Sequence, residues 1–217
     1  MHETVAAPPV KPSWRGWQHA AMFPVALVAG LVLVATAPTS AGRVSSVIFA
    51  STALLLFGVS ALLHRGTWST NVEAVLRRLD HSNIYLIIAG TYTPFAVLGL
   101  PQSSGKLLLS IVWTGALVGV VLTVFWIGVP RWLSTSLYVV VGWVVVFFLP
   151  ALVDGAGLGV VALIAIGGVL YTFGAVVYAV KWPNPSQHTF GFHEVFHLLT
   201  IVAFAVHYIA VWVVVHQ

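Results

Sequence analysis

Long apolar stretches recur along the chain and alternate with short polar segments. The apolar stretches fall at about 20–38, 44–63, 80–100, 106–128, 133–152, 157–180 and 192–215. Each has roughly the 17 to 25 residues that a helix needs to cross a lipid bilayer. The pattern therefore predicts an all-α membrane protein, a bundle of seven transmembrane helices.

The polar segments predict how the chain is divided. Residues 1–19 form a polar, proline-bearing N-terminal tail, and residues 20–217 form a single seven-transmembrane domain. The longest connection, RGTWSTNVEAVLRRL after His64, has room for a short interfacial helix. Because the first apolar stretch belongs to a series of similar stretches, we interpret it as a retained helix rather than a cleaved signal peptide.

The composition agrees with a membrane protein and narrows its chemistry. Hydrophobic residues make up 59% of the chain and charged residues only 6%. The nine Lys and Arg residues are dispersed singly or in pairs, which argues against a nucleic-acid-binding surface. The chain has no cysteine, so any metal site must use nitrogen and oxygen ligands.

Basic residues are distributed unequally between the two sides of the predicted membrane. Cytoplasmic loops of membrane proteins carry an excess of Lys and Arg. With the N-terminus inside the cell, seven basic residues fall on the cytoplasmic side and two outside. The cytoplasmic residues are Lys11, Arg15, Arg65, Arg77, Arg78, Arg131 and Lys181, and the outer ones are Arg43 and Lys106. We predict a cytoplasmic N-terminus and an outer C-terminus, in the plasma membrane.

Several ionisable side chains fall at one end of the predicted helices. An ionisable group inside a membrane helix costs about 2.5–3.5 kcal/mol on insertion scales, so such a residue is a candidate for function. His64 ends the second apolar stretch, Asp80 begins the third, and His193 and His197 begin the seventh. Because successive helices alternate in direction, all four residues are expected in the same, cytoplasmic leaflet.

The spacing of these residues favours a metal site. His193 and His197 are four residues apart and project from one helical face, and Ser60 precedes His64 by the same spacing. Three histidine nitrogens match the ligand number of a catalytic zinc site, with water in the fourth position. In such a site Asp80 can orient or deprotonate the water, and Ser60 can hold a ligand or a substrate oxygen. Three imidazoles also suit iron, nickel or cobalt.

Simpler interpretations stay open for each residue taken alone. His64, beside an arginine, also fits a hydrated boundary residue, and Asp80 also fits a helix N-cap. His81 projects about 100° away from Asp80 and is expected beside the site rather than in it. His207 lies ~21 Å along the helix from His193, too far to share a metal. It is expected to line the interior or to hydrogen-bond another helix. No role is assigned to His2, His19, His188 and His216, which fall in termini or loops.

Three segments together resemble a known family. SALLH (60–64), LDHSNIYLIIAGTYTPF (79–95) and HEVFH (193–197) are similar to the signature regions of the hemolysin III branch of the progestin and adipoQ receptor family. The resemblance covers nearly all seven apolar stretches, in order. It implies a zinc ion held by His64, His193 and His197 near the cytoplasmic face, with Asp80 and Ser60 beside the zinc-bound water.

The resemblance implies two different functions. The family also looks related to alkaline ceramidases, which implies zinc-dependent hydrolysis of a lipid amide or ester. The name of the bacterial branch implies cytolysis, through a pore or another disturbance of the membrane. A non-enzymatic protein of this second, pore-like or receptor-like class would carry structural zinc, which favours four protein ligands. Direct zinc binding by Asp80 would therefore favour the second class. Either class has a membrane lipid as substrate or ligand and allows a homo-oligomer.

His193, Glu194 and His197 also spell HExxH, the helix motif of zinc proteases, in which the glutamate is the general base. In a membrane protease Asp80 would serve as the distant ligand, and the third histidine, His64, would then have no role. We therefore interpret the motif as a pair of histidine ligands, with Glu194 as a residue of the cytoplasmic interface.

Overall fold

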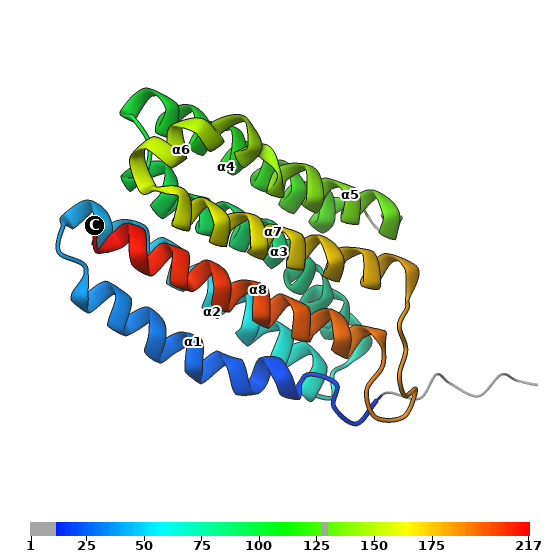
Figure 1. Ribbon diagram of the computed structural model, residues 1–217. Helices are drawn as coiled ribbons and strands as arrows, with labels where there is room; N and C mark the ends of the chain where they lie inside the picture. The colour runs from blue at the N-terminus through cyan, green and yellow to red at the C-terminus, as the bar shows by residue number, and fades with distance from the viewer. Residues whose placement is uncertain (1–11, 127–129) are drawn as a thin grey trace, which may run out of the picture.

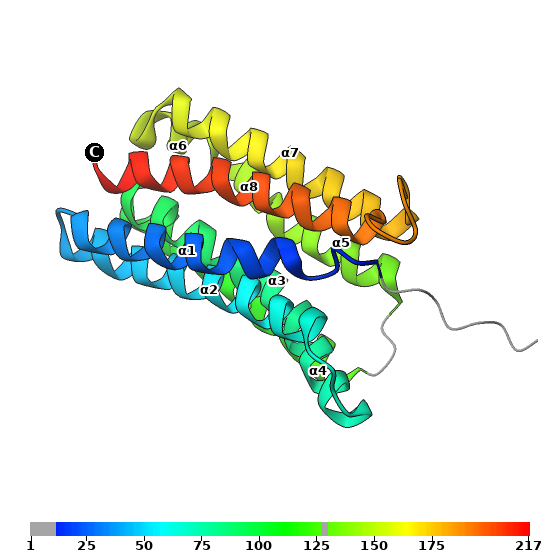
Figure 2. The same ribbon diagram turned by 90° about the horizontal axis from the view of Figure 1, so that it is seen from below.

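The computed structural model describes residues 12–126 and 130–217, and nearly all of these residues are helical. The helices are α1 (Trp17–Thr36), α2 (Ser40–Arg65), α3 (Thr70–Leu98), α4 (Gln102–Phe125), α5 (Arg131–Gly142), the 3-10 helix η1 (Val144–Phe148), α6 (Leu149–Ala156), α7 (Leu158–Val180) and α8 (Phe192–Val215). Neighbours in the chain pack side by side, and α8 closes the bundle against α1 (Figure 1). Seen from below, α3 and α8 also meet across the interior (Figure 2).

The helices are those of a multi-pass membrane protein. Six helical segments are long and apolar enough to cross a bilayer, and α5, η1 and α6 together form one of them. The remaining helix, α3, begins with several charged residues and is therefore less apolar than the others. The predicted all-α bundle of seven helices is confirmed, with α5, η1 and α6 counted together as one. The predicted orientation of the two termini remains a prediction.

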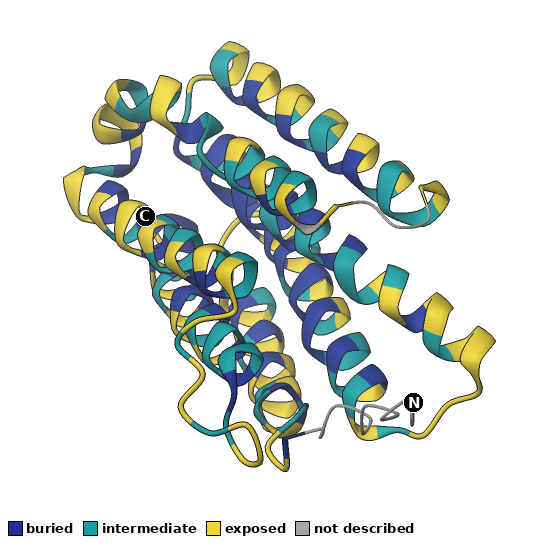
Figure 3. Cartoon of the chain, turned by 90° about the vertical axis from the view of Figure 1, so that its right-hand side faces the viewer, coloured by how far each residue is buried: buried dark blue, intermediate teal, exposed yellow. Residues whose placement is uncertain are grey.

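Buried and exposed residues are arranged as a lipid environment requires. Each helix turns buried residues toward its neighbours and exposed residues outward (Figure 3). Large apolar side chains are prominent among the exposed ones, as in Phe125, Phe147 and Leu158. Small polar residues such as Ser45, Ser46 and Thr52 are buried between helices instead. In a bilayer, where lipid tails are apolar, this distribution leaves the outer face compatible with lipid.

The third helix starts earlier than the sequence analysis predicts. The apolar pattern predicts a connection over residues 65–79 with room for a separate short helix, whereas α3 runs without interruption from Thr70. Asp80 therefore lies almost three turns inside α3 rather than at its N-terminus. The added turns are polar but helix-compatible, and an ion pair between Glu73 and Arg77, four residues apart, bridges successive turns. The alternative that Asp80 caps the helix is wrong.

The fifth membrane-crossing segment is a broken helix. Pro150 at the start of α6 lacks a backbone N–H, and its ring excludes a regular α-helix immediately before it. The chain passes this point through η1. Tyr92 of α3 bridges the break, since its hydroxyl donates to the carbonyl of Gly142 at 2.6 Å and accepts from the N–H of Val145 at 3.0 Å. Backbone groups freed by the break therefore stay paired inside the bundle.

The described part of the N-terminal segment is tied to the bundle. The backbone N–H groups of Ser13 and Trp14 donate to the carbonyls of His188 and Thr189, in the connection between α7 and α8. Residues 17–19 of the predicted tail belong to α1, which begins at Trp17. Residues 1–11 of that tail, including His2 and Lys11, lie outside the described residues.

Candidate metal centre

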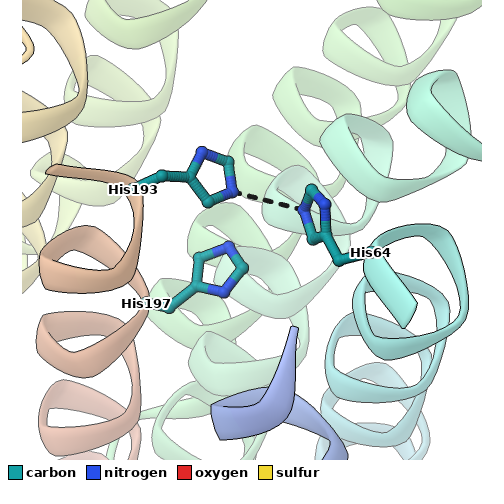
Figure 4. Close-up of side chains that lie close together, drawn as sticks. All are labelled: His64, His193 and His197. Carbon is teal, nitrogen blue, oxygen red and sulfur yellow. Dashed lines mark hydrogen bonds between the residues drawn. The ribbon is translucent and has the colours of Figure 1, made fainter. Parts of the chain in front are cut away.

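Three histidines from two helices converge at one end of the bundle. His64 lies in the last turn of α2, and His193 and His197 lie in the first two turns of α8. The Nε2 atoms of His64 and His193 are 3.2 Å apart. One ligand nitrogen from each of the three side chains lies within 4.8 Å of the other two. Figure 4 shows the three rings turned toward a common centre. The cluster can hold a metal ion.

The separation of the nitrogen atoms agrees with metal binding. Nitrogens bound tetrahedrally to zinc at 2.0–2.1 Å lie about 3.3–3.4 Å from one another. The 3.2 Å between His64 and His193 is close to that value. His197 is buried, and the other two rings are partly buried. The donor set therefore fits zinc, although three imidazoles also suit other transition metals.

The first turn of α8 explains why two ligands are held in place. The amide of Gly191 donates to Glu194 Oε2 at 2.8 Å, and the amide of Phe192 donates to Asn184 Oδ1 at 3.0 Å. These bonds satisfy N–H groups that an α-helix leaves unpaired at its start. The helix therefore begins immediately before His193. Its defined start fixes the positions of His193 and His197 in the first two turns.

Glu194 has a different role from the one that its position in HExxH implies. Its other carboxylate oxygen, Oε1, accepts a hydrogen bond from Arg15 Nε in an ion pair, and only 1% of the side chain is exposed. Both oxygens are thus engaged, one by the N-terminal segment and one by Gly191. The interpretation of Glu194 as a residue of the cytoplasmic interface stays a prediction, and the structure adds that the N-terminal segment covers its side chain. Its contacts also give no support to a role as general base.

Asp80 and Ser60 lie beside the three histidines. Asp80 Oδ2 is 3.9 Å from His64 Nε2, and both side chains are largely buried. That distance exceeds the about 3.3–3.4 Å expected between two ligands of one tetrahedral zinc. Ser60 is buried one turn before His64 and lines the same cavity as Asp80, and its hydroxyl has no hydrogen-bond partner among the described residues. The structure thus brings together all five residues singled out from the sequence.

A fourth histidine joins the cluster and was missed by the sequence analysis. His19, interpreted there as a tail residue, lies in the first turn of α1 and is 2% exposed. Its ring is stacked on the ring of His197, with centroids 3.9 Å apart and planes inclined by 2°. The only sequence signal was its position directly before an apolar stretch, which does not reveal which helix the ring faces.

The remaining histidines near the interior lie apart from the cluster. His207 Nε2 is hydrogen-bonded to the carbonyl of Ile164 in α7 at 3.1 Å, which confirms the predicted bond to another helix. The ring of His81 lies against Tyr178, with centroids 6.4 Å apart. His216 is exposed at the end of α8 and stacks on Trp212.

A cavity extends from the histidine cluster into the bundle. Its volume is about 160 Å³, room for several water molecules, since one needs about 10–15 Å³. Ser60, Asp80, His193 and His197 line one end. Beyond them the wall is formed mainly by α3, α5, η1 and α7, where many residues are apolar, among them Ile84, Ile87, Ile88, Phe95, Val145 and Ile164. The polar cluster is thus continuous with a largely apolar space.

Comparisons with known proteins agree with the family resemblance of the three sequence segments. A family model described as haemolysin-III related matches residues 9–208. The hemolysin-3 homolog of Bacillus subtilis is 37% identical over 175 residues, which are 79% of this chain and 78% of that protein. Hemolysin-3 of Bacillus cereus is 34% identical, over 75% of this chain and 71% of its own. The human monocyte to macrophage differentiation factor is 25% identical, over 90% of this chain and 81% of its own.

Proposed function

Since the chain belongs to the haemolysin-III related family, we propose that it is a zinc-dependent hydrolase that cleaves an amide or ester bond of a membrane lipid. The observation that carries this proposal is the position of the histidine cluster. Three imidazoles and a nearby carboxylate stand at one end of a largely apolar cavity. The reaction would take place near the cytoplasmic face, according to the orientation predicted from the loop charges.

His64, His193 and His197 are the residues that would hold the zinc ion. Zinc in such a site polarises a carbonyl group and lowers the pKa of water. With three protein ligands the coordination of a tetrahedral ion is incomplete, as in catalytic rather than structural zinc sites. We assign Asp80, whose carboxylate oxygen is 3.9 Å from His64 Nε2, to proton transfer rather than to this set, which supports an open coordination position.

The proposed reaction assigns a role to Asp80 and to Ser60. Asp80 accepts a proton from the water that attacks the carbonyl carbon of the substrate. The bond from that carbon to nitrogen or oxygen then breaks, and Asp80 returns the proton to the leaving amine or alcohol. Ser60 lines the same cavity as Asp80, and its unpaired hydroxyl is available to donate a hydrogen bond to a substrate oxygen there.

The cavity favours a lipid with an acyl chain. Side chains such as Ile84, Ile88 and Phe95 line the space beyond the histidines and match the chemistry of a hydrocarbon chain. Burying each methylene group there contributes about 0.8 kcal/mol. A substrate bound in this way places its polar end, with the bond to be cleaved, at the histidine cluster.

Metal content and hydrolysis measured on the same preparations test the proposal. Purified protein in detergent is expected to contain about one zinc per chain, because one tetrahedral cluster has three protein nitrogens. It should release fatty acid from at least one member of a panel of N-acyl and O-acyl lipids. His197→Ala should lose the metal and the activity. Asp80→Asn should keep the metal and lose about 10²–10⁴-fold in rate, the usual contribution of a general acid–base group.

A control variant and two outcomes make the test decisive. His216→Ala removes an exposed histidine at the far end of α8 and should change neither readout. Protein that binds no zinc after reconstitution contradicts the metal site itself. Asp80→Asn protein that loses its metal as completely as His197→Ala would make Asp80 a fourth ligand, which favours a structural ion and contradicts the hydrolase.

The names of two relatives favour a second candidate function. Two bacterial relatives are named for hemolysin-3, and a membrane-disturbing protein with a structural metal ion would suit that name. Dye release from phosphatidylcholine vesicles separates the two candidates. Release that persists in Asp80→Asn, without any lipid cleavage by the wild type, would replace the hydrolase with this second function. A homo-oligomer would be expected in that case.

A further inference from the structure

His19 is the one residue of the histidine cluster for which the proposed reaction has no role. It belongs to α1, whereas the three proposed ligands belong to α2 and α8. Its ligand nitrogens are not part of the three-histidine group that can hold a metal. The ring is nonetheless 2% exposed and lines the same cavity as Ser60 and Asp80. The position of this buried imidazole therefore needs a physical explanation.

The ring of His19 is held by contacts with two other rings and not by hydrogen bonds. Neither of its nitrogens has a hydrogen-bond partner among residues 12–126 and 130–217. One neighbour is the ring of His197, parallel to it with centroids 3.9 Å apart. Another is Phe57 of α2, which meets it edge to face with centroids 5.1 Å apart and planes inclined by 81°. His19 thus contacts both an aromatic side chain of α2 and a proposed metal ligand.

This arrangement restricts the rotation of His197. An imidazole ring turns easily about its bond to the Cβ atom unless a neighbour fixes its plane. A parallel ring with its centroid 3.9 Å away is in van der Waals contact with the face of His197. Any large rotation of His197 about this bond would bring its edge into the ring of His19, whose own rotation is limited by the contact with Phe57. The nitrogen of His197 is therefore kept toward His64 and His193.

The N-terminal segment fixes the position of His19 along the bundle. Arg15, four residues before His19, forms its ion pair with Glu194, between the two ligands of α8. Arg65, next to His64, lies over the ring of Trp17, with its guanidinium carbon 4.1 Å from the ring centroid. Contacts on both sides of the cluster thus hold the start of α1 against the metal-binding ends of α2 and α8.

We propose that His19 is a positioning residue of the metal centre, which holds the ring of His197 in its metal-binding orientation by stacking against it. The proposal rests on the metal site of the proposed function. The face of the ring, and not its nitrogens, does the positioning. A planar apolar ring should therefore replace His19, whereas a side chain of similar size without a flat face should not.

Metal affinity in three variants tests the proposal. We would titrate purified, metal-free protein in detergent with Co²⁺, record the visible absorption of the bound ion, and measure zinc affinity by competition with a chelator. His19→Ala is expected to weaken zinc binding by about 10–100-fold, the usual effect of losing a contact that orients a ligand. His19→Leu should do the same, and His19→Phe should restore the wild-type affinity and the wild-type Co²⁺ spectrum.

A matched control and the contrary outcomes complete the test. His216→Ala removes another histidine that stacks on an aromatic ring of α8, at the far end of that helix, and should leave zinc affinity unchanged. The Leu and Phe variants decide the question even where the Ala variant fails to fold. Wild-type affinity in His19→Leu would overturn the proposal, and so would binding in His19→Phe as weak as in His19→Leu. Wild-type protein that binds neither metal contradicts the metal site and, with it, this proposal.

Discussion

The environment of Glu194 predicts that replacing it with glutamine costs stability but not catalysis. The glutamine is isosteric, and its amide oxygen can still accept the hydrogen bond from the amide of Gly191. The charge is lost, and the NH2 group then faces Arg15 Nε, so the ion pair is replaced by two donors that cannot hydrogen-bond to each other. Because a zinc-protease base would occupy the same position in HExxH, Glu194→Gln separates the anchoring role seen in the structure from a catalytic one.

The expected loss of stability follows from how far the side chains of Arg15 and Glu194 are exposed. Arg15 is 20% exposed and Glu194 1% exposed, so the pair lies between two reference cases. Exposed pairs contribute about 0.2–1 kcal/mol, and breaking a fully buried pair costs about 3–5 kcal/mol. The charge left unpaired is that of Arg15, which is partly exposed and can be hydrated, so we expect a loss of about 1–2 kcal/mol. In a chain of this size each kcal/mol lowers the melting temperature by about 2–4 °C.

Thermal unfolding, zinc content and lipid hydrolysis of Glu194→Gln form the assay. The melting temperature should fall by several degrees, while zinc content and turnover stay within a few-fold of the wild type. Arg15→Gln serves as the partner control, and in the double variant the two losses should be less than additive. A fall in turnover of 100-fold or more, with zinc and stability retained, would make Glu194 the general base and refute the anchoring role.

Three further changes test other contacts. Tyr92→Phe removes the hydroxyl that accepts from the buried N–H of Val145 and should cost about 1–3 kcal/mol of stability, measured by thermal unfolding in detergent. Gly167→Ala places a methyl group against the ring of His207, which overpacks the contact between α7 and α8 and should cost about 1–3 kcal/mol in the same assay. Arg77→Ala breaks an exposed ion pair and should change the melting temperature by less than the other two, because such pairs contribute about 0.2–1 kcal/mol.

The ends of a helix could be predicted closely from the sequence where the helix and its apolar stretch have the same length. The seventh apolar stretch, 192–215, coincides with α8, and 157–180 differs from α7 by one residue. The predicted end of a helix was wrong where the helix continues beyond its apolar stretch. The polar first turns of α3 are helical although they lie outside the apolar stretch, because a local ion pair and helix-compatible residues suffice to continue the helix.

The sequence by itself determined the seven-helix membrane fold and the candidate metal residues. Apolar length and alternating direction are enough to place His64, Asp80, His193 and His197 at one end of the bundle. Only the tertiary structure decided which of these side chains lie in contact. It also decided that Glu194 forms a buried ion pair with Arg15 and that His19 stacks on His197. The physical reason is that hydropathy specifies the depth of a residue, whereas the rotation of each helix about its axis depends on packing against its neighbours.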